Sequence, residues 1–245
     1  MHLSILPTSA EVGAAAARMS IQSLQQILAA QGAARLVLAT GASQFDLLAN
    51  LVQAEDVDWH KVTCFHLDEY VGLPQSHPAS FRKYLQERFS SRLPLAAFHF
   101  IQGDAPDAQS ECVRIGSLLR QSPIDLALVG IGENGHLAFN DPPADFDARE
   151  AYLIVNLDEA CRRQQVGEGW FVSLEAVPRQ AISMSIHQIM ACQRIVCTVP
   201  DLRKAAAVQC SLEGPVSPDC PASILQQHPD CHVFLDAASA SRLKR

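Results

Sequence analysis

Residues Asp125 to Pro143 read DLALVGIGENGHLAFNDPP, and this stretch decides the class of fold that we expect. Its apolar beginning is typical of a buried strand, and the strand runs directly into a glycine-rich loop. The loop then presents His136 and, five residues later, the carboxyl group of Asp141. Because open α/β sheets bind ligands at the carboxyl ends of their strands, we expect a functional site at this loop.

Gly130, Gly132 and Gly135 have the G-x-G-x-x-G spacing of a dinucleotide-binding turn. That motif requires a helix to open directly behind the last glycine. Here the sequence Asn140-Asp141-Pro142-Pro143 follows within a few residues, and successive prolines suit a loop rather than a helix interior. We therefore expect a backbone that curls round a small polar ligand, and we expect no nicotinamide, flavin or other cofactor.

The composition predicts one sizeable hydrophobic core. The chain has 245 residues, 48% of them hydrophobic, with a mean hydropathy of +0.06, so we expect a single domain over residues 1–245. A net charge of −7 without a basic run argues against nucleic-acid and membrane partners. The segment 1–7 lacks the features of a signal peptide. We expect a soluble, cytoplasmic protein.

Eight cysteines are scattered along the chain without a C-x-x-C pair or a cluster at zinc spacing. Most have apolar neighbours, as Cys197 has in the run IVCTV. We expect buried thiols that behave as small hydrophobic side chains, no metal site and a reducing compartment.

Strand and helix patterns alternate along the rest of the chain. A capping-box sequence at 8–11 precedes a long helix, and the segment 142–178 has weak periodicity, so a lid or an irregular insertion is expected there. The alternation predicts an α/β fold with three α/β/α layers and a mostly parallel, doubly wound sheet. The expected strands are 35–39, 61–67, 97–102, the strand before Gly130, 181–185, 195–199 and 232–235, and the expected later helices include 80–89 and 201–213.

Two loops offer anion-binding groups. Thr40, Gly41, Ala42 and Ser43 place hydroxyl and backbone N–H groups at the start of a helix, although the same sequence also occurs in ordinary turns. The segment 201–204 places two cations in a first helical turn, where they oppose the helix dipole. A nearby anion would relieve that repulsion, whereas solvated surface cations are the alternative.

Two further loops carry acid/base groups. Asp68 and Glu69 end an apolar strand beside a tyrosine, which suits a general base as well as a pair of solvated carboxylates. His136, near Asn134 and Asp141, is either structural or oriented for proton transfer. A phosphate clamp beside an acid/base pair, without a metal cluster or a nucleophilic serine, is what proton transfer on a phosphorylated sugar requires.

The sequences LDEYVGLP at 67–74, with His77-Pro78, and GxGxNGHxAFNDP at 130–142 resemble the signature segments of the glucosamine-6-phosphate deaminase/isomerase family. Further similarity at 177–183, 204–205, 213–214 and 225–229 extends the resemblance over nearly the whole chain. It implies the three-layer fold of sugar-phosphate isomerases, which is related to that of 6-phosphogluconolactonase. The activity that it implies is hydrolytic isomerisation of glucosamine 6-phosphate to fructose 6-phosphate and ammonia.

The resemblance also implies catalytic roles. Asp68 matches the enolisation base, His136 the ring-opening group, and Asp141 the carboxylate that orients the histidine, where the family commonly has glutamate. Asn134 occupies a position that is aspartate in many members, so it can form hydrogen bonds but cannot share the acid/base work.

Substrate binding is implied for the loop from Thr40 to Ser43, although Gln44 stands where a proline is frequent. Lys204 matches the phosphate lysine. The family's lid arginine has no clean counterpart in 166–171, and Arg162 or Arg163 could substitute. The substrate-binding residues that we expect are Thr40, Gly41, Ala42, Ser43, Glu69, Gly132, Gly135, Arg163 and Lys204.

Three alternative functions stay open from the sequence. A galactosamine-6-phosphate isomerase differs in a few pocket contacts that sequence spacing does not reveal. A 6-phosphogluconolactonase would have Asp-Gly-His followed by a Ser-Leu-Phe-Pro run, from which residues 134–140 depart. A non-catalytic sugar-phosphate sensor is favoured only by Asn134. The expected partner is a small amino-sugar phosphate, and the resemblance allows a homo-oligomer.

Overall fold

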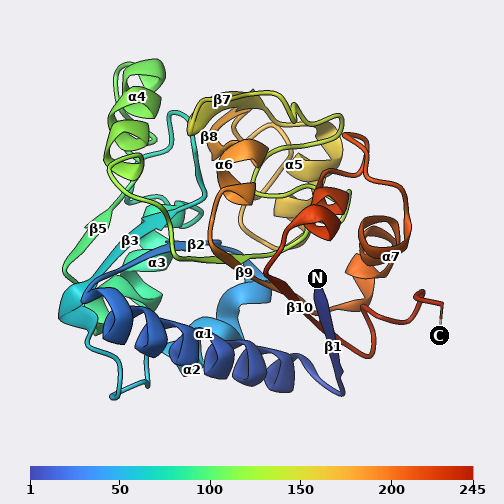
Figure 1. Cartoon of the computed structure of the whole chain (residues 1–245). Helices are drawn as coiled ribbons and strands as arrows, with labels where there is room; N and C mark the ends of the chain where they lie inside the picture. The colour runs from blue at the N-terminus through green and yellow to red at the C-terminus, as the bar shows by residue number, and fades with distance from the viewer. Residues whose placement is uncertain (245) are drawn as a thin grey trace.

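A seven-stranded parallel sheet forms the centre of the molecule in the computed structural model, which describes residues 1–244 (Figure 1). The strand order is β1-β10-β9-β6-β2-β3-β5. The strands are β1 (His2–Leu6), β2 (Ala34–Leu38), β3 (Val62–His66), β5 (Ala97–His99), β6 (Leu126–Val129), β9 (Arg194–Val199) and β10 (Cys231–Asp236).

Helices cover both faces of this sheet, which confirms the expected three-layer α/β/α fold (Figure 1). Helices α1, α2 and α3 pack on one face, and α4, α6 and α7 pack on the other. Their bounds are α1 (Ser9–Gln31), α2 (Phe45–Leu51), α3 (Phe81–Arg88), α4 (Ala108–Leu119), α6 (Ile186–Met190) and α7 (Ala205–Glu213).

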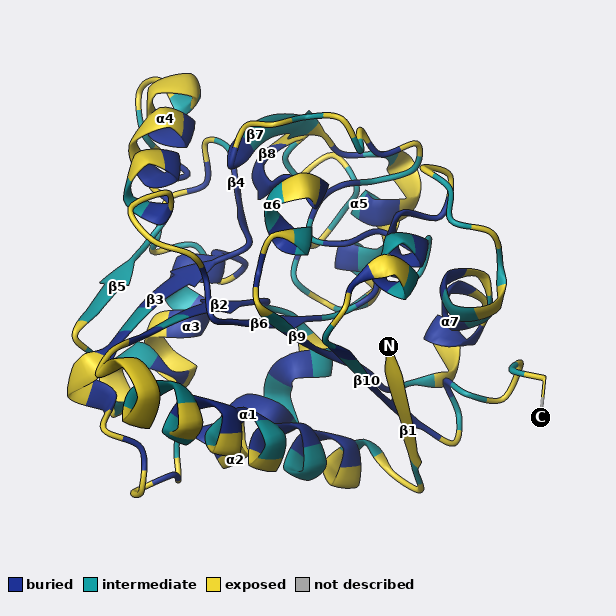
Figure 2. Cartoon of the chain, in the orientation of Figure 1, coloured by how far each residue is buried: buried dark blue, intermediate teal, exposed yellow. Residues whose placement is uncertain are grey.

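The hydrophobic core has two parts, one on each face of the large sheet, because successive side chains of each strand point to opposite faces. In β2, Leu36 and Leu38 face the α1 side, whereas Val37 faces the α4 side, and all three side chains are fully buried. Successive side chains of a strand point to opposite faces, so a strand with helices on both sides must be apolar at every position. Strand β6 is accordingly buried at every position and β9 at every position after Arg194, as Figure 2 shows.

The strand order reverses between β2 and β6. From β2 the chain continues through β3 to β5 on one side, whereas β6, β9 and β10 build the other side. Loops at such a switch point diverge and leave a crevice beyond the strand ends. The loops after β2 and β6 contain Thr40 to Ser43 and Gly130 to His136, so the topology opens a crevice between these two segments.

A second, three-stranded sheet corrects two of our expectations. It has the order β4-β8-β7, with β4 (Asp68–Tyr70), β7 (Tyr152–Asn156) and β8 (Gln180–Met184) paired antiparallel. The strand expected at 181–185 therefore lies outside the parallel sheet. The segment 142–178 contains β7 and helix α5 (Glu159–Gly167) rather than only irregular chain.

Strand β1 was not expected from the sequence. It lies at the edge of the large sheet, where Leu3 and Ile5 are exposed, and its five residues are too few for a distinct strand signal in the sequence (Figure 2). No helix among residues 1–244 is both long enough and apolar enough to cross a membrane.

Gly13 provides a test of the packing between α1 and α2. A Cβ atom at Gly13 would lie 2.3 Å from the Asp46 Cβ and 2.7 Å from the Leu47 nitrogen. We expect Gly13→Ala to lower the free energy of unfolding by about 1–3 kcal/mol through overpacking. A Cβ at Gly167, near the end of α5, meets no atom within 4 Å, so Gly167→Ala should be neutral or slightly stabilising. Urea unfolding of both variants tests this; equal effects would contradict it.

Candidate active site

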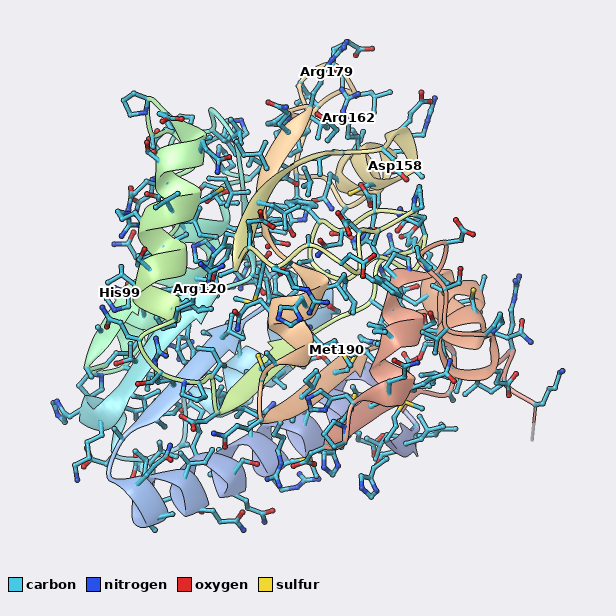
Figure 3. All side chains as sticks on the ribbon, turned by 45° about the horizontal axis from the view of Figure 1, so that its top comes forward. His99, Arg120, Asp158, Arg162, Arg179 and Met190 are labelled. Atoms are coloured by element: carbon cyan, nitrogen blue, oxygen red, sulfur yellow. The ribbon has the colours of Figure 1, made fainter. Side chains whose placement is uncertain are left out.

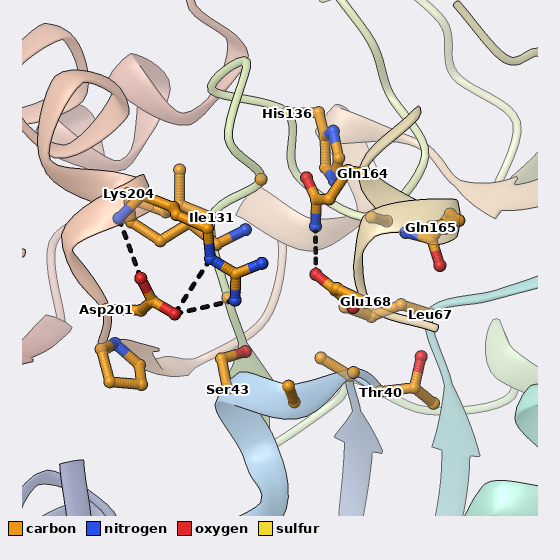
Figure 4. A pocket seen from close by; sticks show the side chains of 18 of the residues that line it. Thr40, Ser43, Leu67, Ile131, His136, Gln164, Gln165, Glu168, Asp201 and Lys204 are labelled. Carbon is orange, nitrogen blue, oxygen red and sulfur yellow. Dashed lines mark hydrogen bonds and ion pairs between the residues drawn. The ribbon is translucent and has the colours of Figure 1, made fainter. Parts of the chain in front are cut away.

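A cavity of about 470 Å³ lies beyond the carboxyl ends of the central strands (Figure 4). Loops that follow β2, β3, β6 and β9 form its wall, and α5 contributes further residues. The residues that line it are Ser9, Ala39, Thr40, Gly41, Ala42, Ser43, Leu67, Asp68, Phe81, Gly130, Ile131, Gly132, His136, Ala138, Phe139, Gln164, Gln165, Glu168, Pro200, Asp201, Leu202, Arg203, Lys204 and Asp236.

The loop after β2 is fixed from two sides. The Tyr84 hydroxyl donates a hydrogen bond of 3.0 Å to the Gly41 carbonyl, and the Gln44 side-chain amide donates one of 2.8 Å to the Thr198 hydroxyl. The latter bond ties the loop to β9. Gly41 has φ +94°, which favours glycine. Ala42 then begins a short 3₁₀ turn, whose first N–H groups lack helical partners, and Ala42 and Ser43 both line the cavity.

Two cations stand opposite this loop. Lys204 is buried, and among residues 1–244 its ammonium forms no hydrogen bond or ion pair. Burial lowers the pKa of Lys204, although Glu168 and Glu133 oppose that effect. Arg203 also lines the cavity, and its guanidinium is held by Asp201 at 2.7 Å. The ammonium of Lys204 thus lacks a counter-ion.

The carboxylate of Asp68 projects into the cavity without a partner. Asp68 is 6% exposed, and no group among the described residues donates a hydrogen bond to its side chain. Burial raises the pKa of Asp68 well above its usual range, and the neighbouring Glu69 adds to the shift. An unpaired carboxylate of raised pKa in a cavity has the properties of a general base.

The histidine loop requires glycine at two positions. A Cβ atom at Gly132 would lie 2.2–2.4 Å from three atoms of the His136 ring, so the imidazole packs directly against the Gly132 backbone. Gly135 has φ +86°, a conformation that L side chains rarely adopt. These glycines therefore position a histidine rather than a pyrophosphate group.

A carboxylate and an amide support His136 from behind. The His136 Nδ1 atom lies 3.1 Å from Asp141 Oδ1, at ion-pair distance but off the direction of a hydrogen bond. The Asn134 amide donates bonds of 3.0 Å to Asp141 and 3.2 Å to Asp158. Burial raises the pKa of Asp141, but His136, the Asn134 amide and the Asp158 N–H outweigh burial, so the net pKa is lowered.

Helix α5 and the residue that follows it supply three cavity residues that the sequence did not reveal: Gln164, Gln165 and Glu168 (Figure 4). The Gln165 side-chain oxygen accepts a bond of 2.8 Å from the Tyr70 hydroxyl, and Gln164 donates one of 2.7 Å to Glu168. Residues 162–168 are mostly polar, and this pattern alone does not indicate that they face a cavity. The cavity-facing residues can be recognised only once α5 is known to be a helix.

Several expected substrate-binding residues lie outside the cavity lining. Glu69 is fully buried with both oxygens bonded to the start of α3, and Gly135 faces Cys220. Arg163 is exposed and paired with Glu159 at 2.5 Å.

Arg162, the other candidate for the family's lid arginine, donates to the carbonyls of Leu174 and Val177. Figure 3 shows it beside Asp158 at α5, and it does not line the cavity. Arg203, on the loop after β9, is the arginine that does.

A family profile described as glucosamine-6-phosphate isomerases/6-phosphogluconolactonase matches residues 7–233. The chain belongs to this family, as its signature segments indicated.

Curated relatives from two bacteria are similar to the chain. The glucosamine-6-phosphate deaminase of Oenococcus oeni is 37% identical over 245 residues, which is the full length of both chains. That of an Exiguobacterium species is 41% identical over 84% of this chain and 80% of its own.

Solved structures agree with the fold. A protein described as a monomeric glucosamine-6-phosphate deaminase is 32% identical, has a TM-score of 0.91, and covers 98% of this chain and 99% of its own. A 6-phosphogluconolactonase from Shewanella baltica, 19% identical with a TM-score of 0.80 over 97% of this chain and 98% of its own, shares the fold alone.

The raised pKa of Asp68 predicts how stability depends on pH. The folded state keeps the proton at pH values where an unfolded aspartate, of pKa about 3.9, has lost it. Ionisation of Asp68 therefore costs stability as the pH rises from about 4 towards the folded pKa, by about 1.4 kcal/mol for each tenfold difference in acid strength between the two states. Asp68→Asn should become more stable than the wild type, by a margin that grows between about pH 5 and about pH 8 in urea unfolding.

Asp141 is a control of opposite sign. Its lowered pKa contributes stability above the ordinary aspartate pKa, and this is lost as the pH falls through the folded pKa. Asp141→Asn should therefore be less stable than the wild type at about pH 8. The same sign for both variants would contradict the environments described above.

Proposed function

We propose that this protein converts glucosamine 6-phosphate and water into fructose 6-phosphate and ammonia. The observation that carries this proposal is the unpaired carboxylate of Asp68, which shares one cavity with His136 and with the uncompensated ammonium of Lys204. The cavity therefore has a cation that can bind the phosphate of the substrate and, beside it, two groups that can transfer protons. Relatives named glucosamine-6-phosphate deaminase, at 36–41% identity, support the choice of substrate.

The phosphate is bound by the loop from Thr40 to Ser43 and by Lys204. Because the Lys204 ammonium is buried in the free protein, it has already lost most of its contact with water. A phosphate oxygen that binds it therefore gains a strong charge interaction at little further cost of desolvation. Arg203 serves as the second phosphate cation in place of the lid arginine. Its guanidinium is held beside the ammonium by Asp201, which limits its loss of side-chain entropy on binding.

The sugar is opened before it isomerises. His136 delivers a proton to the ring oxygen, and the C1 hydroxyl gives its proton to solvent as the C1–ring-oxygen bond breaks. Asp68 then removes the proton from C2 while the aldehyde oxygen takes up a proton from solvent, which gives an enolamine. Asp68 returns the C2 proton to C1 and the amine nitrogen releases one proton to solvent, which leaves a C1 hydroxyl and a C2 imine. Water adds to the imine carbon and ammonia leaves, which yields the ketone of fructose 6-phosphate.

Incubation of the purified protein with glucosamine 6-phosphate tests the proposal, with ammonia and fructose 6-phosphate measured together. Both products should form in equal amounts, and Asp68→Asn should be slower by about 10²-fold to 10⁴-fold, typical of a lost general base. Parallel incubations with galactosamine 6-phosphate and 6-phosphogluconolactone examine the alternatives. Turnover of either in preference to glucosamine 6-phosphate, or binding without turnover, would replace the proposal.

Lys204→Ala should raise KM far more than it lowers kcat. The phosphate lies away from the reacting carbons and is bound equally in the ground and transition states, so its loss weakens uniform binding. Arg203→Ala should raise KM less, because Asp201 already neutralises part of that charge. Steady-state kinetics of both variants, with Lys83→Ala, a partly exposed lysine outside the cavity lining, as the control, decide this. An unchanged KM in Lys204→Ala would remove it from the phosphate site.

His136→Gln should slow turnover of the cyclic substrate by about 10²-fold or more, because ring opening loses its proton donor. An acyclic amino-sugar phosphate that still reaches Asp68 should be affected much less. Asp141→Asn should show the same bias more weakly, since it misorients the imidazole without removing it. Equal losses on the two substrates would assign His136 to enolisation and require another donor for the ring.

The cytoplasmic location, the single-domain organisation and a homo-oligomer remain predictions. The solved relative is described as monomeric, so measurement of the mass in solution is the direct test of oligomeric state.

A further inference from the structure

A buried thiol lies behind the histidine and carboxylate of the active site. Cys161, on α5, is 1% exposed and does not line the cavity. The ligand atoms of His136, Asp141 and Cys161, one nitrogen, one oxygen and one sulfur, all lie within 4.8 Å of one another. The reaction proposed above gives the thiol no role, and its two neighbours come from a different segment of the chain.

The imidazole atom that faces this cluster has an unused hydrogen-bonding position. The His136 Nδ1 atom is buried and has no hydrogen-bond partner within residues 1–244, although Asp141 Oδ1 is 3.1 Å away. A buried ring nitrogen without a partner is costly in a folded protein and indicates an unfilled interaction. When the proton of the neutral His136 ring is on Nε2, the Nδ1 atom has a free lone pair that can bind a metal ion.

We propose that His136 Nδ1, Asp141 Oδ1 and Cys161 Sγ form an inhibitory binding site for a zinc-type divalent ion. Tetrahedral coordination by imidazole, carboxylate and thiolate is typical of zinc, and the fourth position is left to water. Magnesium and calcium are excluded as preferred ions, because they require sets of oxygen ligands. His136 lines the cavity, so the site lies directly behind the cavity wall.

Proton and charge balance is simple. The Cys161 thiol releases its proton to solvent on binding, Asp141 binds as the carboxylate, and His136 binds as the neutral ring. Two negative ligands neutralise the divalent ion. The Asn134 amide continues to support Asp141 Oδ1, and the Asp158 N–H continues to bond Asp141 Oδ2 at 3.0 Å. These contacts hold the carboxylate in place from outside the coordination shell.

Occupation of the site would block the proposed reaction. With Nδ1 bound to the ion, the ring cannot take up a second proton, so the imidazolium that donates to the ring oxygen does not form, and Asp141 no longer acts as the orienting carboxylate. This consequence rests on the proposed function, whereas metal binding itself does not.

Cobalt(II) titration is the first test because it needs no enzymatic activity. The wild-type protein should bind cobalt with a thiolate-to-metal charge-transfer band, and zinc should displace the ion. Cys161→Ser should lose the band and weaken binding by about 100-fold or more, as expected for loss of a direct ligand. Cys112→Ser is the matched control, since Cys112 is also buried but lies on α4, and it should retain the band.

Cys210 is the exposed cysteine, so Cys210→Ser separates adventitious surface binding from the proposed site. A band that survives in Cys161→Ser, or one that disappears in Cys210→Ser, would overturn the proposal. X-ray absorption of the zinc-loaded wild-type protein gives a second measurement that requires no variant. One sulfur ligand with nitrogen and oxygen ligands supports the site, and a shell without sulfur contradicts it.

Inhibition is measured separately, with each variant normalised to its own rate in a chelator. Zinc should inhibit the wild type and Cys112→Ser at concentrations about 100-fold below those needed for Cys161→Ser. Equal inhibition of all three would reject the inhibitory role. If the protein has no deaminase activity but the cobalt band depends on Cys161, the proposed function fails and the metal site stands.

Discussion

The anchoring of Glu69 is the interaction on which the active site depends. Successive side chains of β4 point to opposite sides, so Asp68 and Glu69 cannot face the same space. Glu69 accepts hydrogen bonds from the Ser80 hydroxyl and from the backbone N–H groups of Tyr70, Phe81 and Arg82.

These bonds cap the N-terminus of α3, where a carboxylate also meets the favourable end of the helix dipole. They lower the pKa of Glu69, but burial has the larger effect and raises it overall. With Glu69 committed to α3, the only direction left for Asp68 is the cavity. The two adjacent carboxylates therefore have different roles because of strand geometry rather than chemical type.

The parts of the fold that local pattern controls could be predicted from the sequence. The central strands are continuous apolar runs, the capping box at Thr8 forms as expected, and the loops after β2 and β6 meet because parallel strands end at one edge. The second sheet could not be derived in this way. Its pairing brings Asp68 opposite Ser183, and such a distant register leaves no local trace in the sequence.

The same limit explains which site residues were missed. Gln164, Gln165 and Glu168 reach the cavity because β7 and β8 carry α5 over it, and a polar segment of weak periodicity does not reveal that path. Glu69 is an expected substrate-binding residue, but its side chain is bonded to the start of α3 and lies outside the cavity lining. Recognition of β4 as a strand would have separated the two side chains by alternation alone.

Asn134 illustrates how charge is limited behind the histidine. Its amide donates to both Asp141 and Asp158, so it bridges two carboxylates that would otherwise repel each other. An aspartate here would add a third acid and lose both donors unless it kept a proton. The pKa of Asp141 is lowered despite its burial, mainly by His136, and the Asn134 amide and the Asp158 N–H add to the effect. The amide thus holds an ionised carboxylate next to His136, in a group to which Cys161 adds only a neutral thiol until an ion binds.

Strain and unpaired charge are concentrated around the cavity rather than spread through the fold. The non-glycine residues with positive φ are Ala138 and Asp201, at +51° and +92°, and both line the cavity. Asp68 and Lys204 lie in the same wall, and within residues 1–244 neither side chain forms a hydrogen bond or an ion pair. Such features persist only where the surrounding structure fixes them, and here the capped helices and the buried strands of two sheets do so. The unpartnered groups of the cavity make the free protein less stable than it would otherwise be. A ligand that carries a phosphate for Lys204 and exchangeable protons for Asp68 and His136 supplies the missing interactions.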